Sequence, residues 1–313
     1  MKKLTIFLLV LAMLLALPLF SGCKDPTTEQ PDDNENENPG QTETPENPEE
    51  PENPQEPEDP KDPDDTQKPE EPEVLKLKIG SYNIANGSYV SHNLQTIAND
   101  ILELDLDIIG LQEVDRFANR SKNLDTMKKL AELTGYEYYY FSKAINIAGN
   151  PSVYGQDGEY GTGILSKYPI TFEETTQLAS GGYEQRVLGH VIVQVEDAEV
   201  HFFNAHLTYN TPGVRKGQME AIEEAVYDYD YCLLTGDFNI EALPEFEIIE
   251  SLTGVSNEDN PLHSYWREET PPWPTECLDN IMYSDKFILL DCGIQNDRKH
   301  SDHYLIWAEF EVD

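Results

Sequence analysis

Residues 231–240 read YCLLTGDFNI, an apolar run that delivers two polar side chains, Asp237 and Asn239, directly after a glycine. The apolar run predicts a buried strand, and Gly236 predicts that the chain turns where the strand ends. Residues two positions apart in an extended backbone point to the same side, so we expect the aspartate and the asparagine to project together. Taken alone, such a pair is more typical of a turn than of a functional site.

Polar side chains recur at the ends of other predicted strands, and this repetition changes the interpretation. They are Asn83 in SYN, Gln112 and Glu113 in DIIGLQE, His206 in FFNAH, Asp279 in CLDNIM, and Asp302 and His303 before the final strand. Because strand ends converge along an edge of a sheet, these groups are expected to line one cleft.

The side chains at these strand ends favour hydrolysis assisted by a divalent cation. Carboxylate and amide oxygens are hard ligands that suit Mg²⁺ or Mn²⁺, and the closely spaced Cys and His residues that zinc needs do not occur in the sequence. His206 and His303 supply acid–base capacity near neutral pH. Ser301 stands next to Asp302, but a serine hydrolase is disfavoured because no G-x-S-x-G motif is present.

Hydrophobic periodicity predicts a mixed α/β fold in which helices and strands alternate early and strands dominate later. The expected helices span 94–102, 124–133 and 212–226, and the expected strands include 75–84, 106–112, 136–142, 160–166, 185–195, 199–207, 231–235 and 303–312.

A hairpin is also expected near the C-terminus. Residues 278–284 and 287–293 have strand patterns and are separated by a turn near Asp285. Cys277 and Cys292 flank this hairpin at similar distances from its turn. A disulfide bridge between them is left open, because the register of the two strands is not fixed by the sequence.

Seven motifs, in this order along the chain, resemble the endonuclease/exonuclease/phosphatase family. This is a family of metal-dependent hydrolases that includes deoxyribonuclease I, bacterial sphingomyelinases and inositol-phosphate phosphatases. The motifs are SYNIANG, DIIGLQEVD, YGTGILSKYPI, FFNAHL, TGDFN, LDNIMYS and HSDHYLIW, and the resemblance covers residues 75–312. It implies the deoxyribonuclease I-like fold, a four-layer sandwich of two mainly antiparallel β-sheets flanked by helices.

The resemblance implies a metal site. It makes Glu113 the principal ligand of a Mg²⁺ ion, with Mn²⁺ as the alternative, and it places Asn83 and Asp302 close to the same ion. It gives Asp237 the task of orienting the attacking water or a metal. Asn239 would donate a hydrogen bond to a phosphate oxygen.

The resemblance also implies an acid–base pair. His303 would activate water, and Asp279 would fix its tautomer and stabilise its protonated form. His206 would donate to the leaving oxygen. Candidate substrate contacts are Arg116, Tyr160 and Arg186, although a lone arginine is about as typical of solvated surface. The sequence departs from the family at Asn280, where an aromatic residue is common, and at Thr162, where Asn or Ala is common.

The N-terminal 73 residues are expected to lie outside the catalytic domain, which is assigned to 74–313. Residues 1–23 have the layout of an export signal, and Ser21-Gly22-Cys23 resembles a bacterial lipobox in which Cys23 is lipidated. Phe20 departs from the usual leucine, and an uncleaved membrane anchor is the alternative. Residues 24–73 contain 12 prolines and 20 acidic residues and predict a disordered tether.

The net charge of the predicted catalytic domain favours some classes of substrate over others. Residues 74–313 carry 40 acidic and 16 basic side chains, a net charge of −24, whereas proteins that bind nucleic acid usually present a basic face. We therefore expect a monomeric, lipid-anchored enzyme of the bacterial cell envelope, outside the cytoplasm, that cleaves a small or phospholipid-type phosphodiester. A nuclease acting on DNA or RNA and a non-catalytic surface binding protein are the alternatives.

Overall fold

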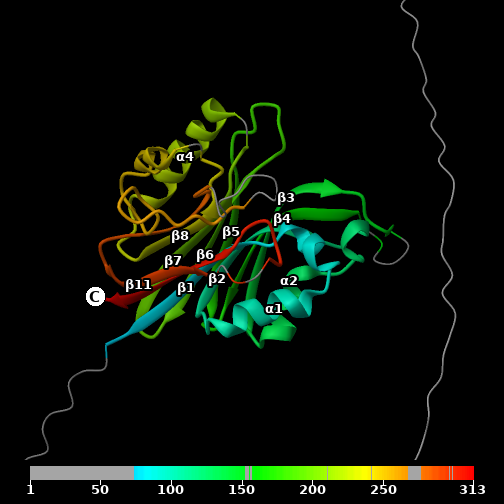
Figure 1. The fold of residues 1–313 in the computed structure, drawn as a ribbon, viewed down its shortest axis with the longest axis horizontal. Coiled ribbons are helices and arrows are strands. Elements are labelled where there is room, and N and C mark those ends of the chain that lie inside the picture. Colours follow the sequence, from blue (N-terminus) through cyan, green and yellow to red (C-terminus); the bar gives the residue numbers. More distant parts are fainter. Residues whose placement is uncertain are drawn as a thin grey trace, which may run out of the picture. The chain divides into compact units, whose positions relative to one another are not determined.

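Two six-stranded β-sheets lie face to face in the computed structural model (Figure 1). It describes residues 74–151, 155, 157–209, 211–240, 242–266, 276–295, 297 and 299–313. The predicted signal peptide at 1–23, its Cys23 and the predicted tether at 24–73 lie outside the described residues. Among the described residues, no helix combines the length and the apolarity needed to cross a membrane.

The first sheet has the strand order β11-β12-β1-β2-β4-β3. Its strands, in this order, are Phe287–Gln295, Leu305–Val312, Lys76–Asn83, Ile108–Arg116, Gly158–Ser166 and Tyr138–Ile147. β1 and β2 are parallel, and all other neighbours in this sheet are antiparallel.

The second sheet has the strand order β5-β6-β7-β8-β10-β9. Its strands, in this order, are Ile170–Gln177, Val187–Val195, Ala198–His206, Cys232–Asp237, Asp279–Tyr283 and Thr253–Gly254. β7 and β8 are parallel, and the remaining pairs are antiparallel. Each sheet therefore contains one parallel pair within an otherwise antiparallel arrangement.

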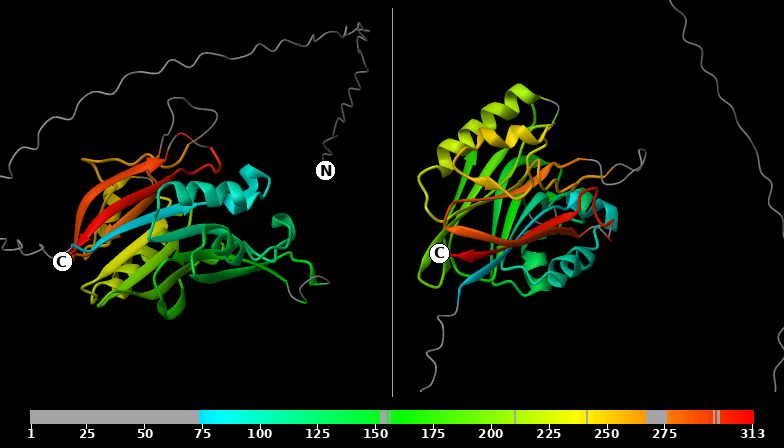
Figure 2. Two further views of the ribbon diagram at one scale, coloured as in Figure 1. Left: turned by 90° about the horizontal axis from the view of Figure 1, so that it is seen from below. Right: turned by 60° about the vertical axis from the view of Figure 1, so that its left-hand side comes forward.

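Helices cover the outer face of each sheet, so the molecule has the four layers that the sequence predicted (Figure 2). They are α1 Leu94–Glu103 and α2 Thr126–Thr134 on the first sheet, and α4 Pro212–Val226 with the 3₁₀ helix η3 Leu243–Ile248 on the second. Short 3₁₀ helices η1 Ala85–Val90 and η2 Asn119–Ser121 complete the elements. α2 begins at Asp125, whose carboxylate accepts a hydrogen bond from the Lys128 N–H at 3.2 Å, and ends at Gly135 with φ 78°.

Three apolar cores hold the described residues together. Two lie between a sheet and the helices on its outer face, and the third lies between the two sheets. It contains β-branched and aromatic side chains from both sheets, among them Ile79, Ile108, Val193, Phe202 and Ile306. The sheets approach closely at Gly110 in β2, where a Cβ atom would lie 2.0 Å from Thr235 Oγ1 in the opposite sheet. Only glycine fits at this position.

The predicted hairpin at the C-terminus is wrong, although its turn exists. Phe287 N–H donates to the Ser284 carbonyl at 3.0 Å, yet β10 pairs with β8 and β9 whereas β11 pairs with β12 in the other sheet. A short connection between two strand patterns does not require them to pair, because the chain can pass from one sheet to the other. The disulfide that the sequence left open is not formed, since Cys277 and Cys292 are both free thiols.

Two strands were missed by the sequence analysis, β5 and the two-residue β9. β5 is an edge strand with the sequence ITFEETTQ, and most of its residues are exposed. Its side chains lack the alternation of apolar and polar residues that marks a half-buried strand. Its position at the edge explains this pattern, because neither face is fully covered.

Candidate active site

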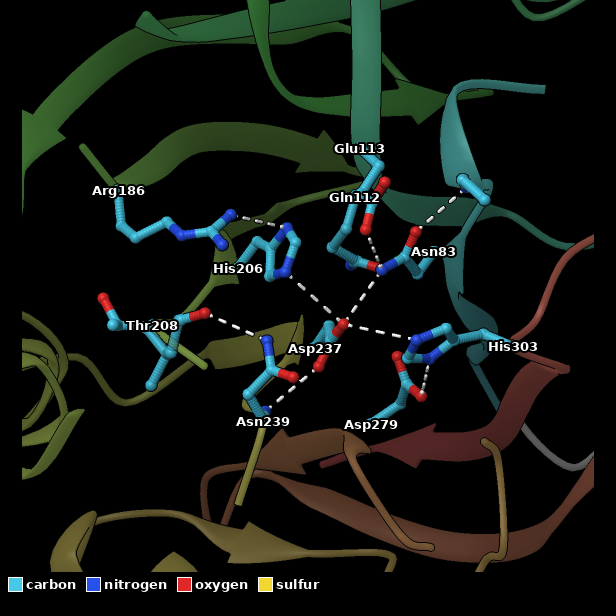
Figure 3. Close-up of polar contacts among 12 residues, drawn as sticks. Asn83, Gln112, Glu113, Arg186, His206, Thr208, Asp237, Asn239, Asp279 and His303 are labelled. Carbon is cyan, nitrogen blue, oxygen red and sulfur yellow. Dashed lines mark hydrogen bonds and ion pairs between the residues drawn. The ribbon is translucent and has the colours of Figure 1, made fainter. Parts of the chain in front are cut away.

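The carboxyl ends of the two parallel strand pairs meet at one place in the molecule. Asn83 ends β1 beside Gln112 of β2 in the first sheet, and His206 ends β7 beside Asp237 of β8 in the second. Asn83 donates a hydrogen bond to Asp237 across the two sheets, with 2.9 Å between Nδ2 and Oδ2. Polar side chains from the ends of β1, β7 and β8 therefore converge with Gln112, which lies inside β2 because this strand continues to Arg116 (Figure 3).

A cleft of about 320 Å³ lies at this place, although Asn83, Gln112 and Asp279 do not line it. Its lining consists of Glu113, Tyr160, Glu184, Arg186, His206, Tyr209, Asp237, Asn239, Tyr265, Leu278, Asp302 and His303. A larger hollow of about 660 Å³ elsewhere is lined by none of the predicted site residues. The single cleft expected from the strand ends is therefore present.

Asp237 occupies the centre of the cluster. Its Oδ2 atom lies 2.9 Å from Asn83 Nδ2 and 3.5 Å from the Nε2 atoms of both His206 and His303. Its Oδ1 accepts the backbone N–H of Asn239 at 3.0 Å. Burial raises the pKa of the Asp237 carboxyl to about 7, although the positive charge of His303 opposes this shift.

Asp237 and Asn239 reach the cleft together, but not in the way the spacing suggested. Gly236 does not turn the chain: it lies inside β8, where a Cβ atom would approach the Ala205 carbonyl to 2.7 Å. The backbone turns at Asn239, which has φ 50°. The bond from the Asn239 N–H to the Asp237 side chain stabilises that turn.

His303 and Asp279 form a buried pair, as the sequence predicted from the family. His303 Nδ1 donates to Asp279 Oδ2 at 2.7 Å, so the Nε2 atom faces Asp237 and the cleft. Ser264 Oγ donates to the same Asp279 oxygen at 2.5 Å and fixes the carboxylate. Burial lowers the pKa of His303, but Asp279 and Asp237 outweigh it and raise the pKa to about 10.

His206 is held in one tautomer by Arg186. A guanidinium can only donate hydrogen bonds, and Arg186 Nη1 lies 3.0 Å from His206 Nδ1. Nδ1 must therefore be the acceptor, which places the ring proton on Nε2, the atom that faces Asp237. Burial, with Arg186 and His303 nearby, holds the pKa of His206 well below its usual range. His206 is thus a neutral, oriented hydrogen-bond donor.

Glu113 enters the cleft through an irregularity in β2. The pairing of β2 with β4 shifts register between Leu111 and Val114, and Glu113 has a left-handed backbone with φ 57°. Such a β-bulge redirects a side chain at the cost of backbone strain, a feature that clusters at functional sites. Burial raises the pKa of the Glu113 carboxyl, although the hydrogen bond from Asn83 and the positive charges of His303 and Arg186 oppose this shift.

Asn83 and Ser301 support the carboxylates. Asn83 Oδ1 accepts the Ala85 N–H at 3.0 Å, and its Nδ2 donates to both Glu113 at 3.2 Å and Asp237. In this orientation the side chain presents hydrogens to the carboxylates, whereas the sequence analysis expected Asn83 close to the ion as a ligand. Ser301 is fully buried and donates to the Asn83 carbonyl at 2.7 Å, so it is no nucleophile.

The donor set fits a hard divalent cation. Glu113, Asp237 and Asp302 line one cleft, and burial raises the pKa values of the first two carboxyls. The ligand atoms of Asp237, Asp279 and His303 also lie within 4.8 Å of one another. In that second group, however, the hydrogen bond from His303 to Asp279 already occupies one carboxylate oxygen. Glu113, Asp237 and Asp302 are therefore the better candidate ligands for Mg²⁺ or Mn²⁺.

Two of the three predicted substrate contacts lie at the cleft, and Arg116 does not. Tyr160 and Arg186 line it. The Arg116 guanidinium lies 2.5 Å from the Glu159 carboxylate and 4.4 Å from the centre of the Phe141 ring. Arg116 is therefore engaged in an ion pair and does not line the cleft, so the structure gives no support to its expected role in substrate binding.

Four residues at the cleft were not found from the sequence. They lie outside the helices and strands, where no periodic pattern marks them, and are Glu184, Tyr209, Tyr265 and Leu278. The departure at Asn280 is also explained. Its amide bonds both the Ser256 N–H at 2.9 Å and the Ser256 carbonyl at 3.0 Å, so it anchors a neighbouring loop.

Residues 80–303 match the model of the endonuclease/exonuclease/phosphatase family. The chain belongs to this family. Endonuclease/exonuclease/phosphatase proteins are metal-dependent hydrolases that act on phosphoesters, which agrees with the carboxylates and histidines of the cleft. No curated protein sequence is significantly similar to this chain.

Solved structures of this family share the fold. A family member from Beutenbergia cavernae is 20% identical with a TM-score of 0.63, over 76% of this chain and 72% of that one. A mannosyl-6-phosphatase from Bacteroides thetaiotaomicron is 19% identical with a TM-score of 0.57, over 75% and 99%. TDP2 from C. elegans is 18% identical with a TM-score of 0.57, over 77% of each chain. At these identities the similarity establishes the fold.

The tautomer of His206 can be tested by NMR. In the metal-free wild type, long-range ¹H–¹⁵N spectra should show His206 as the neutral Nε2–H form at pH 6.5, where an ordinary histidine is half protonated. Arg186→Gln should raise the pKa of His206, because one of the two positive charges that disfavour the imidazolium is lost. Arg116→Gln, which removes a guanidinium from outside the cleft, is the matched control. An Nδ1–H or doubly protonated ring in the wild type would contradict the assignment.

Proposed function

We propose that the protein is a Mg²⁺-dependent hydrolase of a small phosphodiester, with Mn²⁺ as the alternative ion. The observation that carries this proposal is the convergence in one cleft of three carboxylates with the His303–Asp279 pair and the neutral donor His206. Glu113, Asp237 and Asp302 are the residues that would hold the ion. When bound, it would supply positive charge that balances these carboxylates and the phosphate.

The side chains of the cleft divide the remaining chemistry among them. His303 accepts a proton from the attacking water at Nε2, and Asp279 stabilises the imidazolium that results. With a pKa of about 10, His303 is protonated as long as no cation balances the negative charge of Asp237. A cation held by Asp237 and Asp302 would weaken their part of this upward shift and so favour the free base, while the contribution of Asp279 would stay. His206 donates its Nε2 hydrogen to an oxygen of the phosphoester.

The charges around the cleft favour a diester over a monoester. Among the described lining residues, Arg186 is the one arginine or lysine, and Glu113, Glu184, Asp237 and Asp302 are all acidic. A phosphodiester carries one negative charge and a monoester close to two, so the diester meets less repulsion. The similarity to a mannosyl-6-phosphatase makes a sugar phosphomonoester the competing small substrate.

A nuclease remains the second candidate because family members act on nucleic acids, but the basic side chains do not favour it. A nuclease would need basic side chains on one face around the cleft, and the candidates are Arg116, Arg186, Arg215 and Lys216. Arg215 is fully buried and pairs with Glu245 at 2.9 Å, and Lys216 lies 3.4 Å from Glu220. With Arg116 also paired, Arg186 is the only one of the four that lines the cleft.

For localisation, we propose an exported protein anchored to a membrane by lipid on Cys23. The support is the sequence alone: the signal-like residues 1–23 and the proline-rich acidic stretch at 24–73. A stretch of 50 residues can extend on the order of 150 Å when proline keeps it extended. The catalytic domain would then act at a distance from the membrane surface.

Metal dependence is tested at Glu113. Glu113→Gln keeps the size of the side chain but removes a ligand charge, so turnover in Mg²⁺ should fall at least about 100-fold. Without metal, this variant should melt no lower than the wild type, because one buried carboxylate is removed from a crowded cluster. Glu159→Gln, in the ion pair with Arg116, is the control and should retain activity. Full turnover by Glu113→Gln, or by wild type after exhaustive chelation, would remove the basis of the metal site.

Substrate class is tested by the effect of salt. A net charge of −24 should repel duplex DNA, so DNA cleavage should be slow and should not decline when NaCl rises from about 20 to 200 mM, unlike binding through basic side chains. Bis(p-nitrophenyl) phosphate should be cleaved faster than p-nitrophenyl phosphate or mannose 6-phosphate. Efficient plasmid nicking that NaCl suppresses would promote the nuclease. A preference for either monoester would assign a phosphatase instead.

Localisation is tested at the proposed lipidation site. Cys23→Ser should block lipid attachment and cleavage, so the protein should be released from the membrane fraction or retain its N-terminal segment. Fractionation of a bacterial host and mass spectrometry of the purified chain give both readouts. A variant that stays in the membrane fraction at the mass of the wild-type protein, apart from the substituted atom, would rule out the lipobox.

A further inference from the structure

The bulge that carries Glu113 interrupts the pairing of β2 with β4, whereas Gln112 still pairs with Asn83 of β1. Regular pairing between β2 and β4 ends at Leu111, opposite Gly163, and resumes at Val114. Gln112 and Glu113 lie in between, and Glu113 adopts its left-handed backbone there. A buried carbonyl that loses its ladder partner must find another donor, because leaving it unsatisfied costs free energy.

Asn204 supplies that donor from the opposite sheet. It lies in β7, is 0% exposed, and does not line the cleft. Its Nδ2 donates to the carbonyls of Leu111 at 2.9 Å and Gly163 at 2.8 Å. These two residues are the last regular pair before the bulge, so a single side-chain amide holds both strands where the irregularity begins.

The oxygen of the same amide is also fully engaged. Asn204 Oδ1 accepts hydrogen bonds from Gln112 Nε2 at 2.8 Å and from Thr235 Oγ1 at 3.2 Å. Gln112 belongs to the bulge and donates in addition to Ser81 Oγ at 3.1 Å. Asn204 thus contacts the bulge region twice, at the backbone carbonyl of Leu111 and at the side chain of Gln112. Both polar atoms of the Asn204 amide are therefore satisfied, which fixes the orientation of this side chain, whereas the Gln112 Oε1 atom has no hydrogen-bond partner among the described residues.

We propose that Asn204 is a positioning residue for Glu113, which it holds in the cleft by fixing the bulge of β2 from the second sheet. This inference rests on the proposed function only in taking Glu113 as a metal ligand. Asn204 itself touches neither the cation nor the substrate. A partner behind a ligand typically changes metal affinity by about 10- to 100-fold when it is lost.

The proposal is tested by calorimetric titration with Mn²⁺ as the probe. Asn204→Ala removes both donors without introducing charge, and its Mn²⁺ affinity should fall about 10- to 100-fold. Turnover should recover in part when Mn²⁺ is raised, which separates weaker metal binding from a lost catalytic group. Tyr136→Phe is the matched control: it removes a buried O–H that donates to the Leu106 carbonyl, 2.5 Å away and just before β2. This control should cost stability and leave Mn²⁺ affinity unchanged.

A measurement on the wild type covers the case in which Asn204→Ala does not fold. Titration with Mg²⁺ should shift the side-chain amide resonances of Asn204 with the same midpoint as the Glu113 backbone amide. The Asn280 side-chain amide, equally buried but bonded to Ser256, should not move. Unmoved Asn204 resonances would overturn the proposal, as would equal Mn²⁺ affinity in Asn204→Ala and wild type. If the wild type binds no Mn²⁺, the metal assignment fails and the proposal with it.

Discussion

One carboxylate oxygen, Asp237 Oδ2, joins the parts of this molecule that perform its chemistry. Three nitrogen atoms face it, from Asn83 in one sheet, from His206 in the other, and from His303 ahead of the last strand. A buried negative charge is costly unless donors surround it. The position of the strand ends is therefore coupled to the electrostatics of the cleft, because moving either sheet would remove donors from this oxygen.

Much of this arrangement could be predicted from the sequence because the signals are local. Apolar runs that end in Asn83, His206 and Asp237 mark buried strands, and the ends of parallel strands share an edge. The 15-residue helix α4 begins at the proline that predicted its start and ends at Val226, as expected. The pairing of His303 with Asp279 came from the resemblance to the family, and the observed 2.7 Å contact agrees with it.

The features that the sequence did not predict depend on contacts between residues far apart in the chain. Nothing in the segments around Asp285 distinguishes a hairpin from a crossing between sheets. Arg116 and Arg186 look alike in the sequence, and only the fold places Glu159 beside the first. The asparagine in FFNAH is a polar residue inside an otherwise apolar strand, a visible signal of a special role. Which carbonyls it would bond could not be read without the register of the opposite sheet.

The order of strands also determines when the protein can fold. β1 is the first strand of the described domain, yet it lies in the sheet between β2 and β12, the last strand, with Lys76 opposite Glu311. A ribosome that has made most of the chain has therefore still not supplied one neighbour of the first strand. Pairing at such long sequence separation is slow. Delayed closure would keep the nascent chain incompletely folded during synthesis, which is compatible with the export proposed above, because a chain must cross a membrane before its cleft assembles.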